Sequence, residues 1–299
     1  MTFLRRPFDA LVLTTTALSL GLAAVPAMAQ DASVTIPADR IGVVSFSFGS
    51  QLRDDPQGTL EALTACGIEN IEFSGSIDDL RGVSVEQVAA FSGELGFAVP
   101  SIGVGGDEVS GRTDEVIAAA KALGATYVRI SGVDEVEGEA DLDYYTRLAG
   151  VLNESGAAMA AEGITLAYHN HEGEFLADVG NGMSGYDLLL AEVEPENAVF
   201  ELDTLWATVG GADPAALMEE NPGRFPMLHV RDGVMLADAD EPDADDTTVG
   251  QGEIDFEAIF AQSEVAGVEW YFIELGSPQP DGVTATCDSL EYLTATFTE

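Results

Sequence analysis

The chain has 299 residues, of which 53 are acidic and 11 are basic, and its formal net charge is −42 at pH 7. A surface this negative repels nucleic-acid phosphates and anionic membranes, so the composition argues against nucleic acid as a partner. Lys121 is the only lysine, and replacing lysine with acidic residues favours a halophilic protein, because salt screens the repulsion between carboxylates. An acidic exported protein in ordinary salt is the alternative.

Residues 1–29 are predicted to form a secretory signal peptide. Arg5 and Arg6 precede an apolar stretch that ends in the small-residue pattern Ala27-Met28-Ala29. The stretch is shorter than the roughly 20 residues of a transmembrane helix, so we expect cleavage and no membrane association afterwards. The arginine pair fits the twin-arginine route as well as an ordinary signal. Either route predicts a periplasmic or extracellular protein.

The rest of the chain has the length of a single α/β domain, expected at 40–299 after a short linker at 30–39. Eight short apolar segments, each followed by a helical or mixed stretch, are predicted strands: 41–49, 70–75, 98–105, 127–133, 165–171, 198–206, 227–232 and 270–276. Alternation of strand and helix predicts parallel pairing, and eight such units predict a (β/α)₈ (TIM) barrel. An open doubly wound sheet is the alternative, but no glycine-rich dinucleotide fingerprint follows the first strand.

Two further features lie outside these strands. The acidic segment 237–248 follows the seventh predicted strand, and we expect it to be a solvated loop on the face that carries the site. Cys66 and Cys287 fall in predicted helices that would be neighbours in the barrel, so a disulfide is feasible after export. We nevertheless expect two separate buried thiols.

The scarce histidines and two carboxylates all fall on late positions of adjacent predicted strands. TIM-barrel active sites lie at the carboxyl ends of the strands. His169 and His171 share one face, because side chains alternate along a strand. A single histidine is more often structural, but three with two carboxylates predict a site for one divalent metal, Mn²⁺, Co²⁺, Zn²⁺ or Fe²⁺. The residues are His169, His171, Asp203, His229 and Glu274.

Four segments resemble the xylose isomerase-like barrel superfamily, and among its members the sugar phosphate isomerases/epimerases most: GITLAYHNHEGEF (163–175), FELDTLWATVGGADPAALMEENPGRFPMLHVRD (200–232), VGQGEIDFEAIF (249–260) and YFIELGSP (271–278). The resemblance implies a metal held by an acidic residue, an aspartate, a histidine and a glutamate. Asp203, His229 and Glu274 match the last three. His169 stands where the epimerases have glutamate, with His171 as the alternative ligand.

This departure removes one carboxylate of the epimerases' proton relay. Glu172 or Glu174 could replace it, and Glu174 is favoured because relatives place a substrate-contacting glutamate nearby. Trp206 stands where epimerases carry a substrate-contacting histidine, so it is expected either to stack on a sugar ring or to pack in the core. Arg231 lies two residues after His229 and therefore on the same face of the predicted strand. It is expected either to hold a substrate oxygen or to form a salt bridge.

The expected chemistry is proton abstraction next to a carbonyl, with Glu274 as the base and the metal stabilising the enediolate. We therefore predict an exported isomerase or epimerase that acts on a neutral sugar or keto-sugar, since the mouth offers few basic residues for a phosphate beyond Arg231, Arg129 or Arg53.

Two other functions remain open. One is a lyase or dehydratase on a 3-keto-glycoside or inosose, because His171 could protonate a leaving group. The other is a non-catalytic sugar-binding barrel. DNA repair of the endonuclease IV type is disfavoured, because three histidines are too few for a trinuclear zinc site and the charge is wrong for DNA. Barrels of this type often form homodimers, although no apolar surface stripe predicts one here.

Overall fold

The computed structural model describes residues 34–236, 242–276 and 281–299, and the expected signal peptide lies outside them. Contacts between Cα atoms group Val34–Glu299 into one unit. Within the described ranges, none of the helices is both long and apolar enough to cross a membrane.

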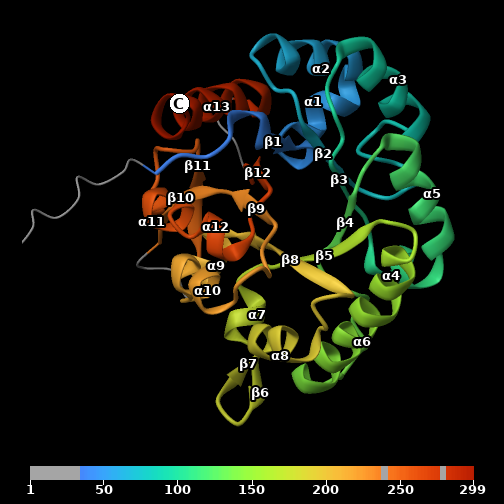
Figure 1. Cartoon of the computed structure of the whole chain (residues 1–299), viewed down its shortest axis with the longest axis vertical. Helices are drawn as coiled ribbons and strands as arrows, with labels where there is room; N and C mark the ends of the chain where they lie inside the picture. Colours follow the sequence, from blue (N-terminus) through green and yellow to red (C-terminus); the bar gives the residue numbers. More distant parts are fainter. Residues whose placement is uncertain (1–33, 237–241, 277–280) are drawn as a thin grey trace, which may run out of the picture. The chain divides into compact units, whose positions relative to one another are not determined.

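Eight parallel strands form a closed barrel in the order β1, β2, β3, β4, β5, β8, β9, β12, which confirms the predicted TIM barrel (Figure 1). Their bounds are β1 Ile41–Val44, β2 Ile71–Ser74, β3 Ser101–Gly103, β4 Tyr127–Ile130, β5 Thr165–His169, β8 Ala198–Asp203, β9 Met227–Val230 and β12 Trp270–Ile273. Several strands end earlier than the apolar runs predict, because the chain turns into a helix. Asp203, for example, accepts a hydrogen bond from the backbone N–H of Trp206 and so caps the helix that follows β8.

Helices surround the barrel (Figure 1). They are α1 Gly49–Asp54, α2 Pro56–Ala65, α3 Val85–Leu95, α4 Gly106–Gly111, α5 Thr113–Leu123, α6 Asp141–Ala160, α7 Gly173–Leu176, α8 Gly185–Glu192, α9 Thr204–Val209, α10 Pro214–Glu220, α11 Phe256–Phe260, α12 Ser263–Ala266 and α13 Gly282–Phe297, with 3₁₀ turns η1 Ala38–Arg40 and η2 Ser45–Phe48. Local sequence explains their ends: Ser84 and Gln87 form a capping box at the start of α3, and Gly96 ends it at a φ of 81°.

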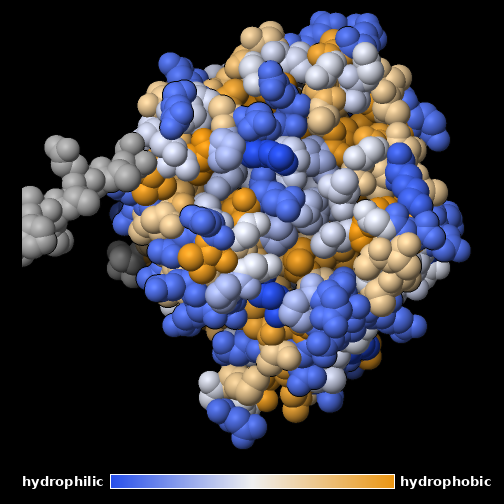
Figure 2. Space-filling model, viewed as in Figure 1, coloured by the Kyte–Doolittle hydropathy of each residue, from blue (hydrophilic) through white to orange (hydrophobic). Residues whose placement is uncertain are grey.

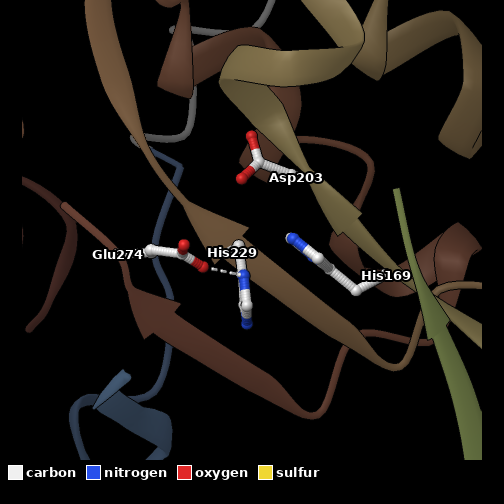
Figure 3. Close-up of side chains that lie close together, drawn as sticks. All are labelled: His169, Asp203, His229 and Glu274. Atoms are coloured by element: carbon white, nitrogen blue, oxygen red, sulfur yellow. Dashed lines mark ion pairs between the residues drawn. The ribbon is translucent and has the colours of Figure 1, made fainter. Parts of the chain in front are cut away.

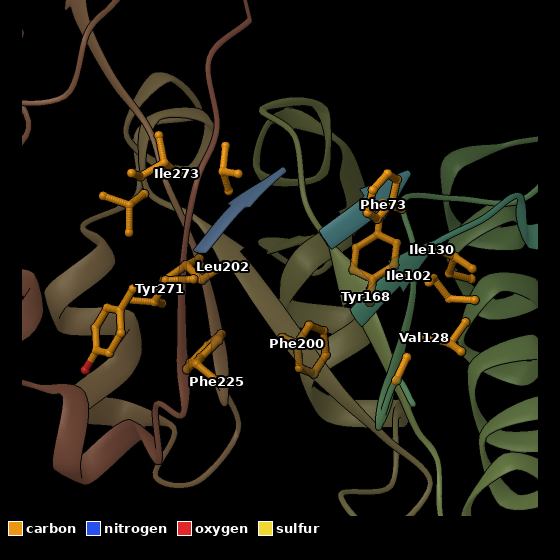
Figure 4. Packing of buried hydrophobic residues seen from close by; sticks show 14 of the residues in the cluster. Phe73, Ile102, Val128, Ile130, Tyr168, Phe200, Leu202, Phe225, Tyr271 and Ile273 are labelled. Carbon is orange, nitrogen blue, oxygen red and sulfur yellow. The ribbon is translucent and has the colours of Figure 1, made fainter. Parts of the chain in front are cut away.

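Alternate residues of each strand pack outward against the helices, as Phe73, Val128, Tyr168 and Phe200 do (Figure 4). A separate apolar cluster consists of Val44, Tyr127, Ala167, Met227 and Phe272. Tyr127, Ala167 and Met227 each stand two residues before a polar side chain on the same strand face, namely Arg129, His169 and His229. The barrel interior is therefore apolar towards the amino ends of these strands and polar towards their carboxyl ends.

Two short antiparallel hairpins extend the loops: β6 Asp178–Gly180 with β7 Met183–Ser184, and β10 Asp232–Met235 with β11 Ala244–Thr247. The β10–β11 hairpin corrects the prediction that residues 237–248 form a solvated loop. Residues 237–241 lie outside the described residues, but 244–247 pair with β10, and Ala244 is buried. Asp246 of β11 accepts hydrogen bonds from Arg231 Nε and Nη2, at 2.6 and 2.9 Å. The hairpin thus returns a carboxylate to the barrel mouth.

The last helix, α13, ties together distant parts of the chain. The backbone N–H of Ile36, which is buried, donates to the carbonyl of Phe297 at 2.7 Å, so part of the expected linker packs on the barrel. Cys66, directly after α2, forms a disulfide with Cys287 in α13, with Cα atoms 5.9 Å apart. The expectation of two separate thiols was wrong, because α2 and α13 pack against each other and bring the two cysteines together.

Replacing Cys66 and Cys287 by alanine is expected to lower the free energy of unfolding by about 2–4 kcal/mol. The bridge joins positions 221 residues apart, so its loss restores much conformational entropy to the unfolded chain. Denaturant unfolding of wild type and double variant, with and without reductant, measures the effect. Reductant should destabilise only the wild type. Equal stability of oxidised wild type and double variant would contradict a stabilising bridge.

Hydrophilic side chains cover much of the face seen in Figure 2, and its hydrophobic residues form several separate patches. The more exposed large hydrophobic residues include Phe46, which follows β1. The surface in this view therefore has the mixed character expected from the composition.

Candidate metal site

Four buried side chains from neighbouring strands converge at the carboxyl end of the barrel (Figure 3). His169 and Asp203 are the last residues of β5 and β8, His229 lies in β9, and Glu274 directly follows β12. One nitrogen or oxygen of each lies within 4.8 Å of those of the other three. The structure therefore brings together the four residues that the sequence predicted as metal ligands.

The hydrogen bonding of these four residues fits a cation. Each has one buried atom without a hydrogen-bond partner in the described part of the chain: His169 Nδ1, Asp203 Oδ2, His229 Nδ1 and Glu274 Oε2. His229 Nδ1 and Glu274 Oε2 approach as an ion pair, but without hydrogen-bond geometry. Buried polar atoms left unpartnered are costly, and one ion bound by Asp203, His229 and Glu274 would satisfy the three on those residues. His169 Nδ1 lies 3.9 Å from Glu201 Oε2. Two imidazoles and two carboxylates suit Mn²⁺, Co²⁺, Zn²⁺ or Fe²⁺.

The far side of the His229 ring faces two carboxylates that the sequence analysis did not single out. Its Nε2 lies 3.0 Å from Glu201 Oε2 and 3.3 Å from Glu72 Oε1. Glu72 also accepts hydrogen bonds from Arg129 Nε at 2.8 Å and from Ser101 Oγ at 2.5 Å. A carboxylate on the far nitrogen of a histidine fixes the ring orientation and leaves the other nitrogen for a metal.

Burial and charge set the protonation of this group. Burial raises the pKa of Asp203 to about 7, although Arg231 opposes it. Burial lowers the pKa of His169 well below its usual value, so this ring is neutral and keeps a lone pair for a metal. Burial also acts to lower the pKa of His229, but Glu201 and Glu274 outweigh it and raise that pKa. A metal would therefore compete with protons at Asp203 and His229.

Two predicted substrate-contacting residues border the four. The His171 ring lies 4.9 Å from the His169 ring and 6.0 Å from the Trp206 ring, measured between centroids. Both His171 and Trp206 are half-buried. Trp206 Nε1 has no hydrogen-bond partner among the described residues, so it has a free donor. Their position allows both side chains to contact a molecule held at the four ligands.

Arg231 forms a salt bridge, one of its two expected roles. Its guanidinium makes the bidentate pair with Asp246 and lies 4.5 Å over the Trp206 ring. Its Nη1 also lies 3.7 Å from Asp203 Oδ2 and 4.0 Å from Glu274 Oε1. Arg231 is thus held rigidly by a salt bridge next to two of the candidate ligands.

Glu174 lies apart from the four. Its Oε1 accepts a hydrogen bond from the Tyr168 hydroxyl, and its Oε2 accepts one from the backbone N–H of His171 at 3.1 Å. Tyr168 precedes His169 on β5, so it points to the helix side of the strand rather than into the barrel. The structure therefore buries Glu174 against Tyr168, at the edge of a cavity that also borders His171, whereas Glu172 remains half-buried at the rim.

An acidic cavity of about 740 Å³ borders His171 on the loops that follow β4 and β5. Glu135, Glu137, Glu139 and Glu172 line it together with Tyr144. This side of the mouth is consequently negative.

Glu174→Gln is expected to remove a pH-dependent loss of stability. Burial raises the pKa of Glu174 to about 7 from an ordinary 4.5, so the folded protein binds this proton more tightly than the unfolded chain. The resulting stabilisation is complete below pH 4.5 and is lost as the pH rises through 7, a change of about 3 kcal/mol. Unfolding free energies at pH 5 and pH 8 should differ less in the variant than in wild type, and an unchanged difference would contradict this assignment. Glu219→Gln, at an exposed position in α10, is the control.

Glu72, Glu201, Arg129 and Asp246 are the polar residues of the site that the sequence analysis missed or left without a role. The signal available for the first three was a charged residue at an inward-facing position of an otherwise apolar strand. For Asp246 no such signal existed, because it comes from the hairpin.

Comparison with known proteins supports the architecture. The family model of the xylose isomerase-like TIM barrel matches residues 60–295. No curated protein matches the sequence. A sugar phosphate isomerase/epimerase from Parabacteroides distasonis superposes with a TM-score of 0.72 at 22% identity, over 92% of this chain and 100% of that chain.

Two other solved structures share the fold at lower identity. The IOLI protein with a binding zinc atom gives a TM-score of 0.69 at 15% identity, over 87% of this chain and 100% of that one. The probable 3-DHS dehydratase AsbF from Bacillus anthracis gives a TM-score of 0.61 at 13% identity, over 85% of this chain and 98% of that one.

Proposed function

Because this chain belongs to the xylose isomerase-like TIM barrel family, we propose that it is a metal-dependent sugar isomerase or epimerase. It abstracts a proton from the carbon next to a carbonyl of a sugar or keto-sugar. The observation that carries this proposal is the convergence of His169, Asp203, His229 and Glu274 at the barrel mouth, where each offers a nitrogen or oxygen within 4.8 Å of those of the other three.

A divalent ion held by these residues would supply Lewis-acid stabilisation of the negative charge that develops on the carbonyl oxygen. Glu274 takes the proton. Although burial acts to raise its pKa, His229 and Arg231 outweigh burial and keep the pKa below its usual range, so the carboxylate is ionised as a base must be. Its Oε2 pairs with His229 Nδ1, and its Oε1 lies 4.0 Å from Arg231 Nη1.

His171, Trp206 and Arg231 orient the substrate. Burial lowers the pKa of His171, so at neutral pH it is a neutral imidazole that can accept or share a proton at the rim. Trp206 offers an aromatic face and a free indole N–H. Arg231, fixed by Asp246, directs positive charge towards the oxygens of the sugar.

A lyase or dehydratase is the second candidate. It is favoured by His169, which provides an imidazole where the epimerases have a glutamate, and by the burial of Glu174 against Tyr168. The two-carboxylate relay of an epimerase is therefore incomplete, whereas His171 beside His169 could return a proton to a departing group.

We also propose that the protein is exported. The signal-like sequence of residues 1–29 supports this, as does the disulfide between Cys66 and Cys287, because such bonds persist in oxidising compartments.

The function is tested by incubating metal-loaded protein in D₂O with a panel of free and 3-oxidised sugars and analysing the products by mass spectrometry and NMR. An isomerase or epimerase gives an isomer that carries deuterium next to the carbonyl. A lyase or dehydratase gives a product lighter by the eliminated group. Sugar binding without exchange or product would instead support the non-catalytic barrel.

A further inference from the structure

Arg81 lies on the rim of the barrel mouth, on the loop that follows β2. Its Nε donates to the hydroxyl of Ser74, the last residue of β2, at 3.1 Å, and its guanidinium lies 4.4 Å over the Phe46 ring. The stem packs against Gly49, where an added Cβ would approach Arg81 Cδ to 2.8 Å. β2 stands across the barrel from β8, the strand that carries Asp203. These contacts hold the arginine, and no residue in the described part of the chain forms a hydrogen bond with its two terminal nitrogens.

The charge of Arg81 has no carboxylate within ion-pair distance among the described residues, unlike those of Arg129 and Arg231. Arg129 pairs with Glu72 and Arg231 pairs with Asp246. Burial lowers the pKa of Arg81, and the positive charge of Arg129 adds to this effect, while the carboxylate of Glu274 opposes it. Arg81 therefore brings a positive charge without an ion-pair partner among the described residues to the mouth of a protein with 53 acidic residues.

The backbone of Arg81 is itself unusual. Its φ of 60° lies in the left-handed region, which non-glycine residues seldom adopt, and the following residue, Gly82, has a φ of 98°. A hydrogen bond from Leu80 N–H to the Val83 carbonyl at 2.9 Å closes the turn around these residues. Such strain persists where the surrounding structure fixes it, which is common at functional sites.

We propose that Arg81 binds a carboxylate of the substrate, which makes the substrate a sugar acid, such as a uronate or its keto derivative. This inference rests on the proposed function and replaces the expectation of a neutral sugar. A planar guanidinium with two free terminal nitrogens matches a carboxylate in bidentate geometry, and one positive charge neutralises one carboxylate. The acidic cavity on the β4 and β5 side repels the same group, so the two sides of the mouth together orient the substrate.

Binding of paired probes tests the inference. The dissociation constants of D-glucuronate, D-glucose and D-glucose 6-phosphate are measured by calorimetry on zinc-loaded wild type and on Arg81→Gln and Arg81→Lys. Wild type should prefer glucuronate over both other probes. Arg81→Gln should weaken glucuronate binding about 10- to 100-fold and leave glucose binding unchanged, because only the charged hydrogen bonds are lost. Arg81→Lys should retain part of the preference.

Arg40→Gln is the matched control, since it removes the same charge from an exposed position before β1, at the opposite end of the barrel. It should leave all three constants unchanged, and retained glucose binding shows that a variant is folded. An equal preference in wild type and Arg81→Gln, absence of any glucuronate binding, or an Arg81-dependent preference for the phosphate would each overturn the assignment. If the protein prefers the carboxylate but catalyses no deuterium exchange, the proposed reaction is contradicted, whereas the assignment of Arg81 as a carboxylate site is retained.

Discussion

Glu274→Gln is expected to reduce turnover by about 10²- to 10⁴-fold, the usual contribution of a positioned acid–base group. The amide keeps the shape of the side chain but cannot accept the substrate proton. It also removes one of two carboxylates from the metal group, so metal affinity should fall as well. Activity must therefore be compared at saturating metal, with the metal content of each sample measured.

Deuterium exchange separates the two effects. At saturating metal, exchange into the substrate should fall by the same factor as turnover, because both require proton abstraction by Glu274. Glu219→Gln, on the exposed surface of α10, should behave as wild type. Exchange at the wild-type rate in Glu274→Gln would assign the base to another residue.

Arg129→Met is expected to lower the free energy of unfolding by about 3–5 kcal/mol, the cost of leaving a buried charge without its partner. Arg129 Nε lies 2.8 Å from Glu72 Oε1 and 3.5 Å from Glu201 Oε2, and both glutamates are fully buried. Burial acts to raise the pKa of Glu72, but Arg129 and His229 lower it to about 2. Without Arg129, much of that stabilisation of the Glu72 carboxylate disappears.

Denaturant unfolding at several pH values measures this effect. A carboxyl group whose pKa is lower in the folded than in the unfolded protein stabilises the fold at pH values above its unfolded pKa. For Glu72, this contribution is lost as the pH falls through 2. The difference between wild type and Arg129→Met should thus be full at pH 7 and shrink towards pH 3. Arg147→Met, which breaks the surface pair with Glu139, should change stability little. Glu72→Gln combined with Arg129→Met should recover part of the loss, and strictly additive effects would contradict a coupled pair.

The barrel and the metal group were predictable because both depend on local patterns. Eight short apolar segments separated by helical stretches specify parallel strands, and the carboxyl ends of such strands meet around one mouth. His169, Asp203, His229 and Glu274 stand at or near those ends, so their convergence follows from the topology without knowledge of side-chain packing.

Other features depend on contacts between residues far apart in the chain. The Cys66–Cys287 bridge requires α2 and α13 to be in register. Glu174 was expected at the reaction centre, but the orientation of the turn after β5 brings it to Tyr168. Arg81 has a left-handed backbone conformation, and its side chain packs against Gly49 and over Phe46. Sequence patterns carry no information about such orientations.

The central claim, that one divalent cation is bound by His169, Asp203, His229 and Glu274, is tested most directly by X-ray diffraction from crystals grown with Zn²⁺ and measured on both sides of the zinc absorption edge. The account predicts an anomalous peak at the barrel mouth within about 2.0–2.2 Å of one atom from each of the four side chains. It also predicts that His229→Ala loses this peak. A mouth without zinc in wild-type crystals, or zinc bound there by other residues, would contradict it.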